Sequence, residues 1–182
     1  GTTAFSDSTA GDGQNLGTVT IGPSTTASVT TSSKMKVINL TIGADDALDI
    51  SDDTLTITGS GTSGSRPFIH TTGTFTINSS TVKFTGTSDT TIQETTYNNL
   101  ELSPSGGSTP IFTLATAGSK TITTQNFTVG NGTNAVSVTA ETNNPILDIN
   151  GDLLVDNGGT FTEGSENITV GTDGTTNGDF TI

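Results

Sequence analysis

The chain of 182 residues is long enough for one domain with a real core or for two small domains. Its formal net charge of −13, from 18 acidic and five basic residues, disfavours binding to nucleic acid and to anionic membrane surfaces. The lack of cysteine excludes disulfides and thiolate metal sites, and no apolar run approaches the roughly 18 residues of a membrane span.

The composition favours short strands and many turns. Apolar residues make up 29% of the chain and charged residues only 13%, which is not the pattern of highly charged, disordered proteins. Threonine, whose β-branched side chain favours strands, accounts for about a quarter of the residues. The 23 glycines and five prolines fit many turns. We therefore expect an all-β protein.

Residues 1–16 form a distinct segment at the start of the chain. They are small and polar, and Phe5 and Leu16 are their only large apolar side chains. We expect this segment to be a flexible arm, or an arm that pairs as a strand with a neighbouring molecule. The main domain is then expected to occupy residues 17–182.

Short runs of alternating apolar and polar residues follow along the whole chain. This alternation has the period of a half-buried strand, and each run ends near Gly, Asn or Asp, which are turn residues. No segment has a convincing helical period. In chain order, the predicted strands are 18–22, 27–30, 36–43, 54–59, 74–78, 81–86, 97–102, 111–114, 120–130, 135–139, 146–155, 159–162 and 167–171.

The recurrence of these runs indicates a repeat. Leading runs begin near residues 18, 39, 54, 74, 99, 126 and 152, with steps of roughly 15 to 27 residues, which is the range of solenoid coils. A solenoid needs apolar residues only on the inside of each coil, which suits the low apolar content. A β-sandwich also has many short strands, but its centre is usually richer in aromatic residues. We therefore predict a right-handed parallel β-helix, with a β-sandwich as the alternative.

A resemblance to a known family also supports the prediction of a β-helix. The phrases that carry it are Tyr-Asn-Asn-Leu-Glu-Leu (97–102), Lys-Thr-Ile-Thr-Thr-Gln-Asn-Phe-Thr-Val-Gly-Asn-Gly (120–132), Ile-Asn-Gly-Asp-Leu-Leu-Val (149–155) and Gly-Thr-Phe-Thr (159–162). In this order they resemble the repeats of large prokaryotic cell-surface proteins of the β-helical, adhesin-like kind. The N-terminal half shares the composition but not the Tyr-Asn-Asn-Leu phrase. The resemblance implies an extracellular structural or adhesive role, with no shared catalytic residues.

One acidic cluster is a candidate metal site. Its five carboxylates could share a Ca²⁺ ion, which takes six to eight oxygen ligands and suits extracellular loops. The spacing does not match an EF-hand loop, because the glycine and the closing glutamate are absent. The alternative is a set of solvated turn acids, and no other cofactor is expected. The cluster consists of Asp45, Asp46, Asp49, Asp52 and Asp53.

Catalytic signatures are absent from the sequence. His70 is the only histidine and Arg66 the only arginine, and no partner cysteine or serine elbow suggests a triad. β-Helical polysaccharide hydrolases and lyases cluster aspartates with basic residues on one face, and the pair Asp45 and Asp46 alone does not meet that pattern. We therefore predict that the protein is not an enzyme.

Threonine pairs separated by one apolar residue recur along the predicted strands. Both threonines of a pair would face one side of the sheet, and a flat stacked array of them could order water as ice-binding solenoids do. The variable steps along the chain disfavour such an array, and the alternative is simply a polar outer face. The pairs are Thr18/Thr20, Thr54/Thr56, Thr74/Thr76, Thr121/Thr123 and Thr160/Thr162.

Five Asn-x-Ser/Thr sequons are candidate glycosylation sites if the protein is exported. Several sequons are expected by chance in a chain so rich in Thr and Asn. They begin at Asn39, Asn78, Asn126, Asn131 and Asn167.

Taken together, these patterns predict an extracellular, non-enzymatic structural protein. We expect a subunit or segment of a surface filament, sheath or stalk that self-associates by end-to-end strand pairing. The first alternative is a monomeric adhesin or carbohydrate-binding module. The less favoured alternatives are a β-helical polysaccharide-active enzyme and an ice-binding protein. Neither nucleic acid nor membrane insertion is expected, whereas glycans are candidate partners.

Overall fold

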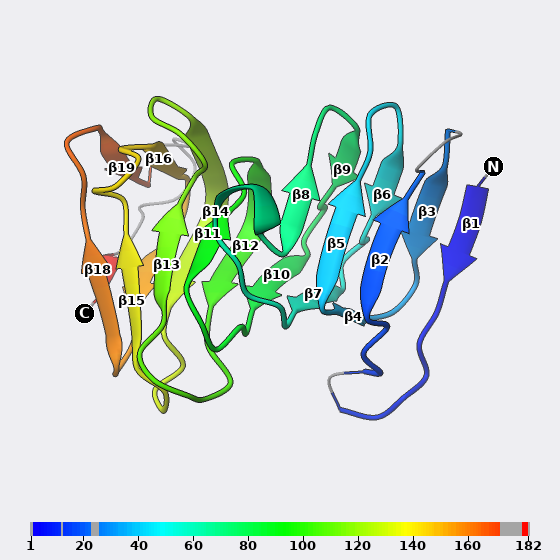
Figure 1. The fold of residues 1–182 in the computed structure, drawn as a ribbon, viewed down its shortest axis with the longest axis horizontal. Helices are drawn as coiled ribbons and strands as arrows, with labels where there is room; N and C mark the ends of the chain where they lie inside the picture. Colours follow the sequence, from blue (N-terminus) through cyan, green and yellow to red (C-terminus); the bar gives the residue numbers. More distant parts are fainter. Residues whose placement is uncertain (1, 12, 23–25, 172–179, 182) are drawn as a thin grey trace.

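The computed structural model describes residues 2–11, 13–22, 26–171 and 180–181. It is an all-β fold with 48% strand, and its parallel strands stack as a β-solenoid of about seven turns. Figure 1 shows the strands side by side along the long axis, with the N-terminal end at the right and the C-terminal end at the left. The predicted fold class is therefore confirmed.

The alternative β-sandwich is wrong. Every strand pairing among the described residues is parallel, whereas a sandwich is built from antiparallel sheets. The only helix in the described part of the chain is the single 3₁₀ turn η1 at Ser63–Ser65.

Each coil of the solenoid passes over up to three faces in a fixed order. The first face carries β2 (Thr18–Ile21), β5 (Asn39–Ile42), β8 (Phe68–His70), β11 (Thr90–Ile92), β13 (Ile111–Leu114), β15 (Val136–Thr139) and β18 (Gly159–Thr162), all at the front of Figure 1. The second face carries β1 (Thr2–Phe5), β3 (Ser28–Thr31), β6 (Ala47–Asp49), β9 (Thr74–Thr76), β16 (Ile146–Ile149) and β19 (Ile168–Val170).

The third face completes each coil. It carries β4 (Met35–Val37), β7 (Thr54–Ile57), β10 (Thr81–Phe84), β17 (Leu153–Val155) and β20 (Phe180–Thr181). Two longer strands, β12 (Thr96–Leu102) and β14 (Thr121–Val129), run over the second and third faces without a break. The first half of β14 pairs with β16, and its second half pairs with β17.

The strand register shows that the coils differ in length. Thr81 pairs with Asn99, whereas Leu40 pairs with Phe68, so the coil that begins at Leu40 is the longer of the two. The predicted equivalence of the runs at 54 and 74 is wrong, because Thr54 pairs with Thr81 and belongs to the third face. Strands on all three faces have the same alternating sequence pattern, so the sequence does not show to which face a run belongs.

The core is a set of apolar columns that run along the solenoid axis. Side chains alternate between inside and outside along each strand, and parallel pairing in register places each inward residue on its counterpart in the next coil. Burying each large side chain contributes about 1.5–3 kcal/mol relative to leaving it exposed. This thin core explains how a chain with few apolar residues folds. One fully buried column is Val37, Ile57, Phe84, Leu102 and Val129.

Two predicted strands are divided by corners. The predicted strand 36–43 is β4 followed by β5, and the outward side chain of Ile38 between them is 44% exposed. The predicted strand 146–155 is β16 followed by β17, separated at residues 150–152. At 146–155 the inward side chains Leu147, Ile149, Leu153 and Val155 keep one alternation through the corner, so the sequence pattern conceals the bend. At 36–43 the alternation shifts by one residue between Val37 and Leu40, but the apolar Ile38 masks this shift in the sequence. The structure also contains β1, β6 and β11, which the sequence pattern missed.

Residues 2–5 form the edge strand β1, which pairs with β3 of the same chain. The loop that follows is held by Asp7, whose carboxylate accepts hydrogen bonds from the backbone N–H groups of Thr9 (2.8 Å) and Gln14 (2.7 Å). The hydrogen bonds that the Asp7 carboxylate accepts from Thr9 are the main reason that the pKa of Asp7 is lowered. Whether residues 1–16 also pair with a neighbouring molecule stays a prediction.

Tyr97, the only tyrosine, lies fully buried in the core, and its hydroxyl donates a hydrogen bond to the backbone oxygen of Gln93 at 2.7 Å. Burial, reinforced by the negative charge of Glu94, raises its pKa well above the ordinary value of 10.0. The unfolded chain ionises near pH 10, so stability from this group is present below that pH and falls as the pH rises above it.

We expect tyrosinate absorbance to appear only as the protein unfolds above pH 10. A titration followed in parallel by absorbance near 295 nm and by circular dichroism checks this expectation. Tyr97→Phe should remove the absorbance change and make stability less sensitive to pH in this range. Ionisation of Tyr97 near pH 10 with the circular dichroism unchanged would contradict the expectation.

One ion pair joins adjacent coils on the third face. Lys83 and Glu101 are paired in register, their Nζ and Oε1 atoms lie 2.7 Å apart, and their side chains are 33% and 26% exposed. We expect Lys83→Met to lower the free energy of unfolding by about 1 kcal/mol or less, because solvent screens such pairs. A double-mutant cycle with Glu101→Gln measures the coupling, and a coupling several times larger would contradict the expectation.

Candidate functional site

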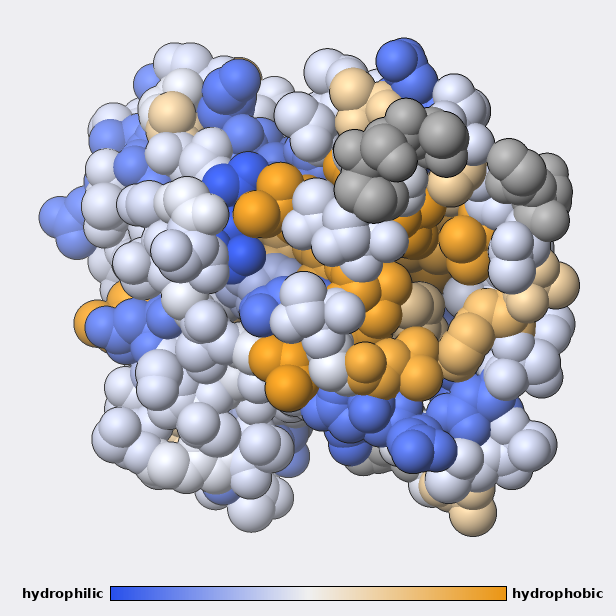
Figure 2. Space-filling model, turned by 45° about the vertical axis from the view of Figure 1, so that its right-hand side comes forward, coloured by the Kyte–Doolittle hydropathy of each residue, from blue (hydrophilic) through white to orange (hydrophobic). Residues whose placement is uncertain are grey.

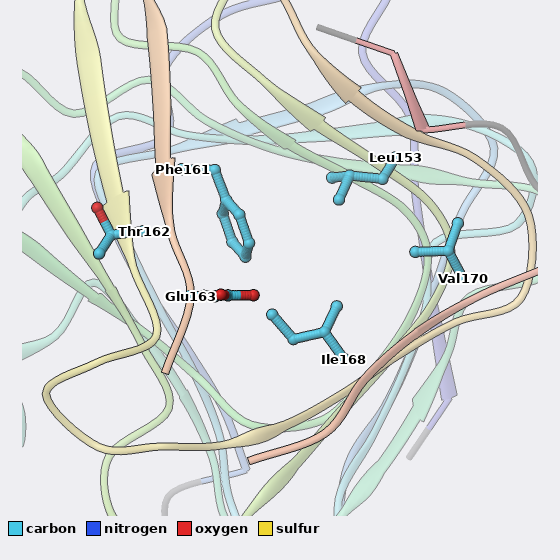
Figure 3. Close-up of a pocket in the computed structure, with 6 residues that line it drawn as sticks. All are labelled: Leu153, Phe161, Thr162, Glu163, Ile168 and Val170. Carbon is cyan, nitrogen blue, oxygen red and sulfur yellow. The ribbon is translucent and has the colours of Figure 1, made fainter. Parts of the chain in front are cut away.

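The C-terminal end of the solenoid contains an open apolar hollow of about 510 Å³. The side chains of Leu153, Ile168 and Val170 point into it, and the ring of Phe161 lies on the opposite side (Figure 3). Thr162 and Glu163 complete its lining. The hollow therefore joins strands of all three faces, which lie apart from one another along each coil.

The inward columns of the described residues reach their last layer at the hollow. Phe161 continues the column of Phe112 and Val138, both fully buried, but is itself only partly buried. Ile168 and Val170 are likewise partly buried beyond the fully buried positions of β16. Phe161 still packs edge-to-face on Phe127, with ring centroids 6.1 Å apart. In the described part of the chain, the last inward layer is thus covered on one side only.

The N-terminal end shows the same arrangement from the other direction. Phe5, Val19 and Val29 are apolar side chains of the first strands that are only partly buried against the core. Leu16 and Ile38 nearby are 40% and 44% exposed. Figure 2, which turns this end toward the viewer, shows apolar atoms gathered between polar rims.

The predicted acidic cluster is divided between two corners and a strand. Asp45 is exposed in the turn before β6 and has a positive φ of 64°. Asp46, beside it, is 2% exposed and turned inward, and its Oδ1 accepts a hydrogen bond from Ala27 N at 2.8 Å. Asp46 Oδ2 has no hydrogen-bond partner among the described residues. The side chain fits because Gly22 has no Cβ, which would lie 1.8 Å from Asp46 Oδ1.

The other three acids lie at the end of β6 and the next corner. Asp49 Oδ1 accepts hydrogen bonds from Ser51 N and Asn78 Nδ2, and Asp52 Oδ1 accepts one from Ser79 N. Asp53 accepts a hydrogen bond from Thr81 N through its backbone oxygen. No group of three or more His, Cys, Asp or Glu side chains that could hold a metal occurs among the described residues. A shared Ca²⁺ ion stays a prediction.

The only histidine and the only arginine are both engaged in structural contacts. Arg66 Nε donates to Gln93 Oε1 at 2.8 Å, and the same oxygen accepts from His70 N at 3.3 Å. The His70 ring hydrogen-bonds through Nε2 to the backbone oxygen of Gly73 at 2.8 Å and through Nδ1 to Thr95 Oγ1 at 3.2 Å. These contacts tie the irregular segment around η1 to the next coil.

The asparagine side chains of the five sequons differ in whether they make hydrogen bonds within the protein. Asn167 is exposed, and among the described residues its side chain makes no hydrogen bond. Asn167 is therefore the sequon most open to a modifying enzyme, and glycosylation stays a prediction. The other amides donate inside the fold: Asn39 to Thr18, Asn78 to Asp49, Asn126 to Asn99 and Asn131 to Pro104.

Some outward threonines stack in register despite the uneven coil lengths. Thr91, Thr113, Thr139 and Thr162 form one column on the first face, because the differences in coil length are absorbed by the corners. The variable steps along the sequence therefore do not exclude a regular outer array. Thr91 is buried and accepts a hydrogen bond from Ser63 N, which shortens the accessible column. Ice binding stays a prediction.

Comparison with known proteins gives no relatives: no family model matches the chain, and no curated protein or solved structure matches it. In the described part of the chain, no helix is long and apolar enough to cross a membrane. Among the described residues, the candidate functional site consists of the apolar hollow at the C-terminal end and the partly buried apolar side chains at the N-terminal end.

Proposed function

We propose that this chain is a non-enzymatic structural protein of the extracellular space or cell surface. It acts as a subunit or segment of a filament, sheath or stalk, and it extends by end-to-end strand pairing. The observation that carries the proposal is that both ends of the described solenoid present an apolar cross-section and parallel strand edges. Such ends need a cap or a partner, because solenoid stability comes from contacts between neighbouring coils.

Two further observations support this proposal. The resemblance of residues 97–171 to the repeats of prokaryotic β-helical surface proteins supports the extracellular location. The contacts of His70 and Arg66 with backbone and amide groups support a non-enzymatic role, because the only histidine and arginine already serve the fold.

The proposal is tested by the association state of the purified chain. We expect sedimentation velocity to show species that grow with protein concentration, and negative-stain electron microscopy to show linear particles of uniform width. Heterologous contacts that do not close into a ring produce open polymers of this kind. A single monomeric species at every soluble concentration would contradict the proposal.

A monomeric adhesin or carbohydrate-binding module is the alternative. Sugar-binding surfaces usually present aromatic side chains, and the large apolar residues exposed in the described structure are all aliphatic: Leu16, Ile38, Ile111, Ile146 and Leu154. Measurable binding on a glycan array by a monomeric species would favour this alternative over the filament.

A further inference from the structure

We propose that the joint between two copies is formed by β1 of one copy, which adds in parallel to the outer edge of β19 of the next copy. In this joint, Phe5 enters the hollow beside Val170. The inference rests on the proposed end-to-end assembly and identifies its contact. It names a second copy of this chain as the occupant of the hollow.

The first argument is the edge that each strand presents. β1 is the outermost strand of the sheet β1-β3-β6-β9, and in the described part of the chain β19 is the outermost strand beyond β16. Each is the second-face strand of its coil, so adding β1 to β19 continues one face without a change of direction. Strand addition to an exposed edge is a common mode of recognition, in which backbone hydrogen bonds provide affinity and side-chain pockets provide specificity.

The second argument is the register of the inward side chains. Each second-face strand carries two inward residues, two positions apart. In β16 these are Leu147 and Ile149, and they pair with Ile168 and Val170 of β19. In β1 the corresponding positions are Thr3 and Phe5, which pair with Val29 and Thr31 of β3.

Continuing the ladder therefore fixes the partners in the joint. Thr3 would lie on Ile168, Ala4 on Thr169 and Phe5 on Val170. Phe5 is the large apolar side chain that β1 offers at an inward position, and Val170 lines the hollow. An aromatic side chain buries about 150–250 Å², so Phe5 would cover much of the exposed apolar lining.

The third argument is the distribution of charge along the axis. In the range 1–40, the acids Asp7 and Asp12 are balanced by Lys34 and Lys36. No basic residue follows Lys120. Joining two C-terminal ends would bring like charges together, whereas joining the N-terminal end to the acidic C-terminal end avoids this repulsion and steers the encounter. The acids of the described C-terminal coils are Glu141, Asp148, Asp152, Asp156, Glu163 and Glu166.

The joint has a geometric consequence on the first face. β2, the first strand of that face, pairs with β5 and lies one coil deeper than β1. When β1 lies on β19, one strand is missing on the first face between β18 and β2 of the next copy. These two strands are then farther apart than hydrogen-bonded neighbours by one strand spacing, about 4.8 Å. The second face thus carries the contact.

Cysteine trapping tests the proposed register in the full chain, which has no native cysteine. Ala4 and Thr169 both point outward, and Ala4 is exposed. Strands in register lie about 4.8 Å apart, within the Cα separation that a disulfide spans. We expect the double variant Ala4→Cys/Thr169→Cys to give a ladder of covalent multimers on oxidation, which reductant removes.

A matched control places the second cysteine at the same end but on another face. Ala4→Cys/Thr160→Cys uses the exposed Thr160 of β18, which does not line the hollow and which the proposed joint leaves out of reach. We expect no multimer ladder from this pair. A ladder of equal intensity from the control would overturn the proposed register.

A second variant tests the role of Phe5 without crosslinking. Phe5→Asp should abolish concentration-dependent association, because a carboxylate would be buried in the hollow without a partner. Ala4→Asp, one residue away and pointing outward, should retain it. Circular dichroism of both variants should match the parent chain, since both positions lie on the edge strand β1.

The outcomes separate the joint from the proposed function. Linear assemblies with neither crosslinking through β19 nor sensitivity to Phe5→Asp would overturn this joint and leave the filament proposal standing. Monomers at every concentration would overturn both.

Discussion

Replacing Phe112 by alanine is expected to lower the free energy of unfolding by about 3–5 kcal/mol. Its side chain is fully buried, and in register it lies between Thr90 of the preceding coil and Val138 of the following one. The cavity would lie inside a close-packed column, where the backbone ladders on both sides prevent neighbouring coils from moving inward. Urea denaturation followed by circular dichroism measures the loss.

Ile111 provides the matched control in the same strand. Its side chain points outward and is 43% exposed, so Ile111→Ala should cost about 1 kcal/mol or less. Equal losses at the two positions would contradict the assignment of alternate sides to the core and the solvent.

Replacing Gly73 by alanine is the second change with a large expected effect. A Cβ at this position would lie 2.4 Å from the backbone oxygen of Gly43 and 2.5 Å from that of Asp46. The Asp46 oxygen also accepts the hydrogen bond of Thr74 N at 2.7 Å, so it cannot move away without breaking the ladder. We expect a loss of about 3 kcal/mol, at the upper end of the usual range for overpacking.

Gly64 is the matched control for this backbone contact. A Cβ there would meet no atom within 4 Å, and Gly64 is not among the glycines with positive φ. Gly64→Ala should therefore leave the melting temperature within a few degrees, which corresponds to about 0.5 kcal/mol for an exposed site. If Gly73→Ala were as mild as Gly64→Ala, the close stacking of the corners would be wrong.

The apolar columns could be predicted from the sequence because alternation alone decides which side chains face inward. Leu55, Ile57, Val82 and Phe84 all occupy the apolar positions of predicted strands, and all are fully buried. Parallel stacking then follows from the low apolar content, since a solenoid needs only a thin core.

The shortest strands could not be predicted because their own residues do not require a strand. β11 consists of Thr90, Thr91 and Ile92, with a single large apolar residue. It is extended because it pairs with β13 and because Gly61 of the preceding coil bridges to Thr90. Backbone hydrogen bonds to neighbouring coils, rather than local propensity, decide such segments.

The candidate site, too, could be predicted from the sequence only in part. The sequence places five acids close together between Asp45 and Asp53, yet it does not show that Asp46 turns into the corner left free by Gly22. Nor does it show the hollow, because Leu153, Phe161 and Val170 come from strands on three different faces. Only the arrangement of the last coil brings them together.

The sequence by itself determined that the chain is all-β, that its apolar residues line the inside of stacked coils, and that its outer surface is acidic and rich in threonine. These properties follow from residue period and composition, which act locally. The tertiary structure decided which strands are neighbours, where the corners fall and what the two ends expose. Those features depend on backbone pairing between residues a whole coil apart, such as Leu40 and Phe68, which no local pattern encodes.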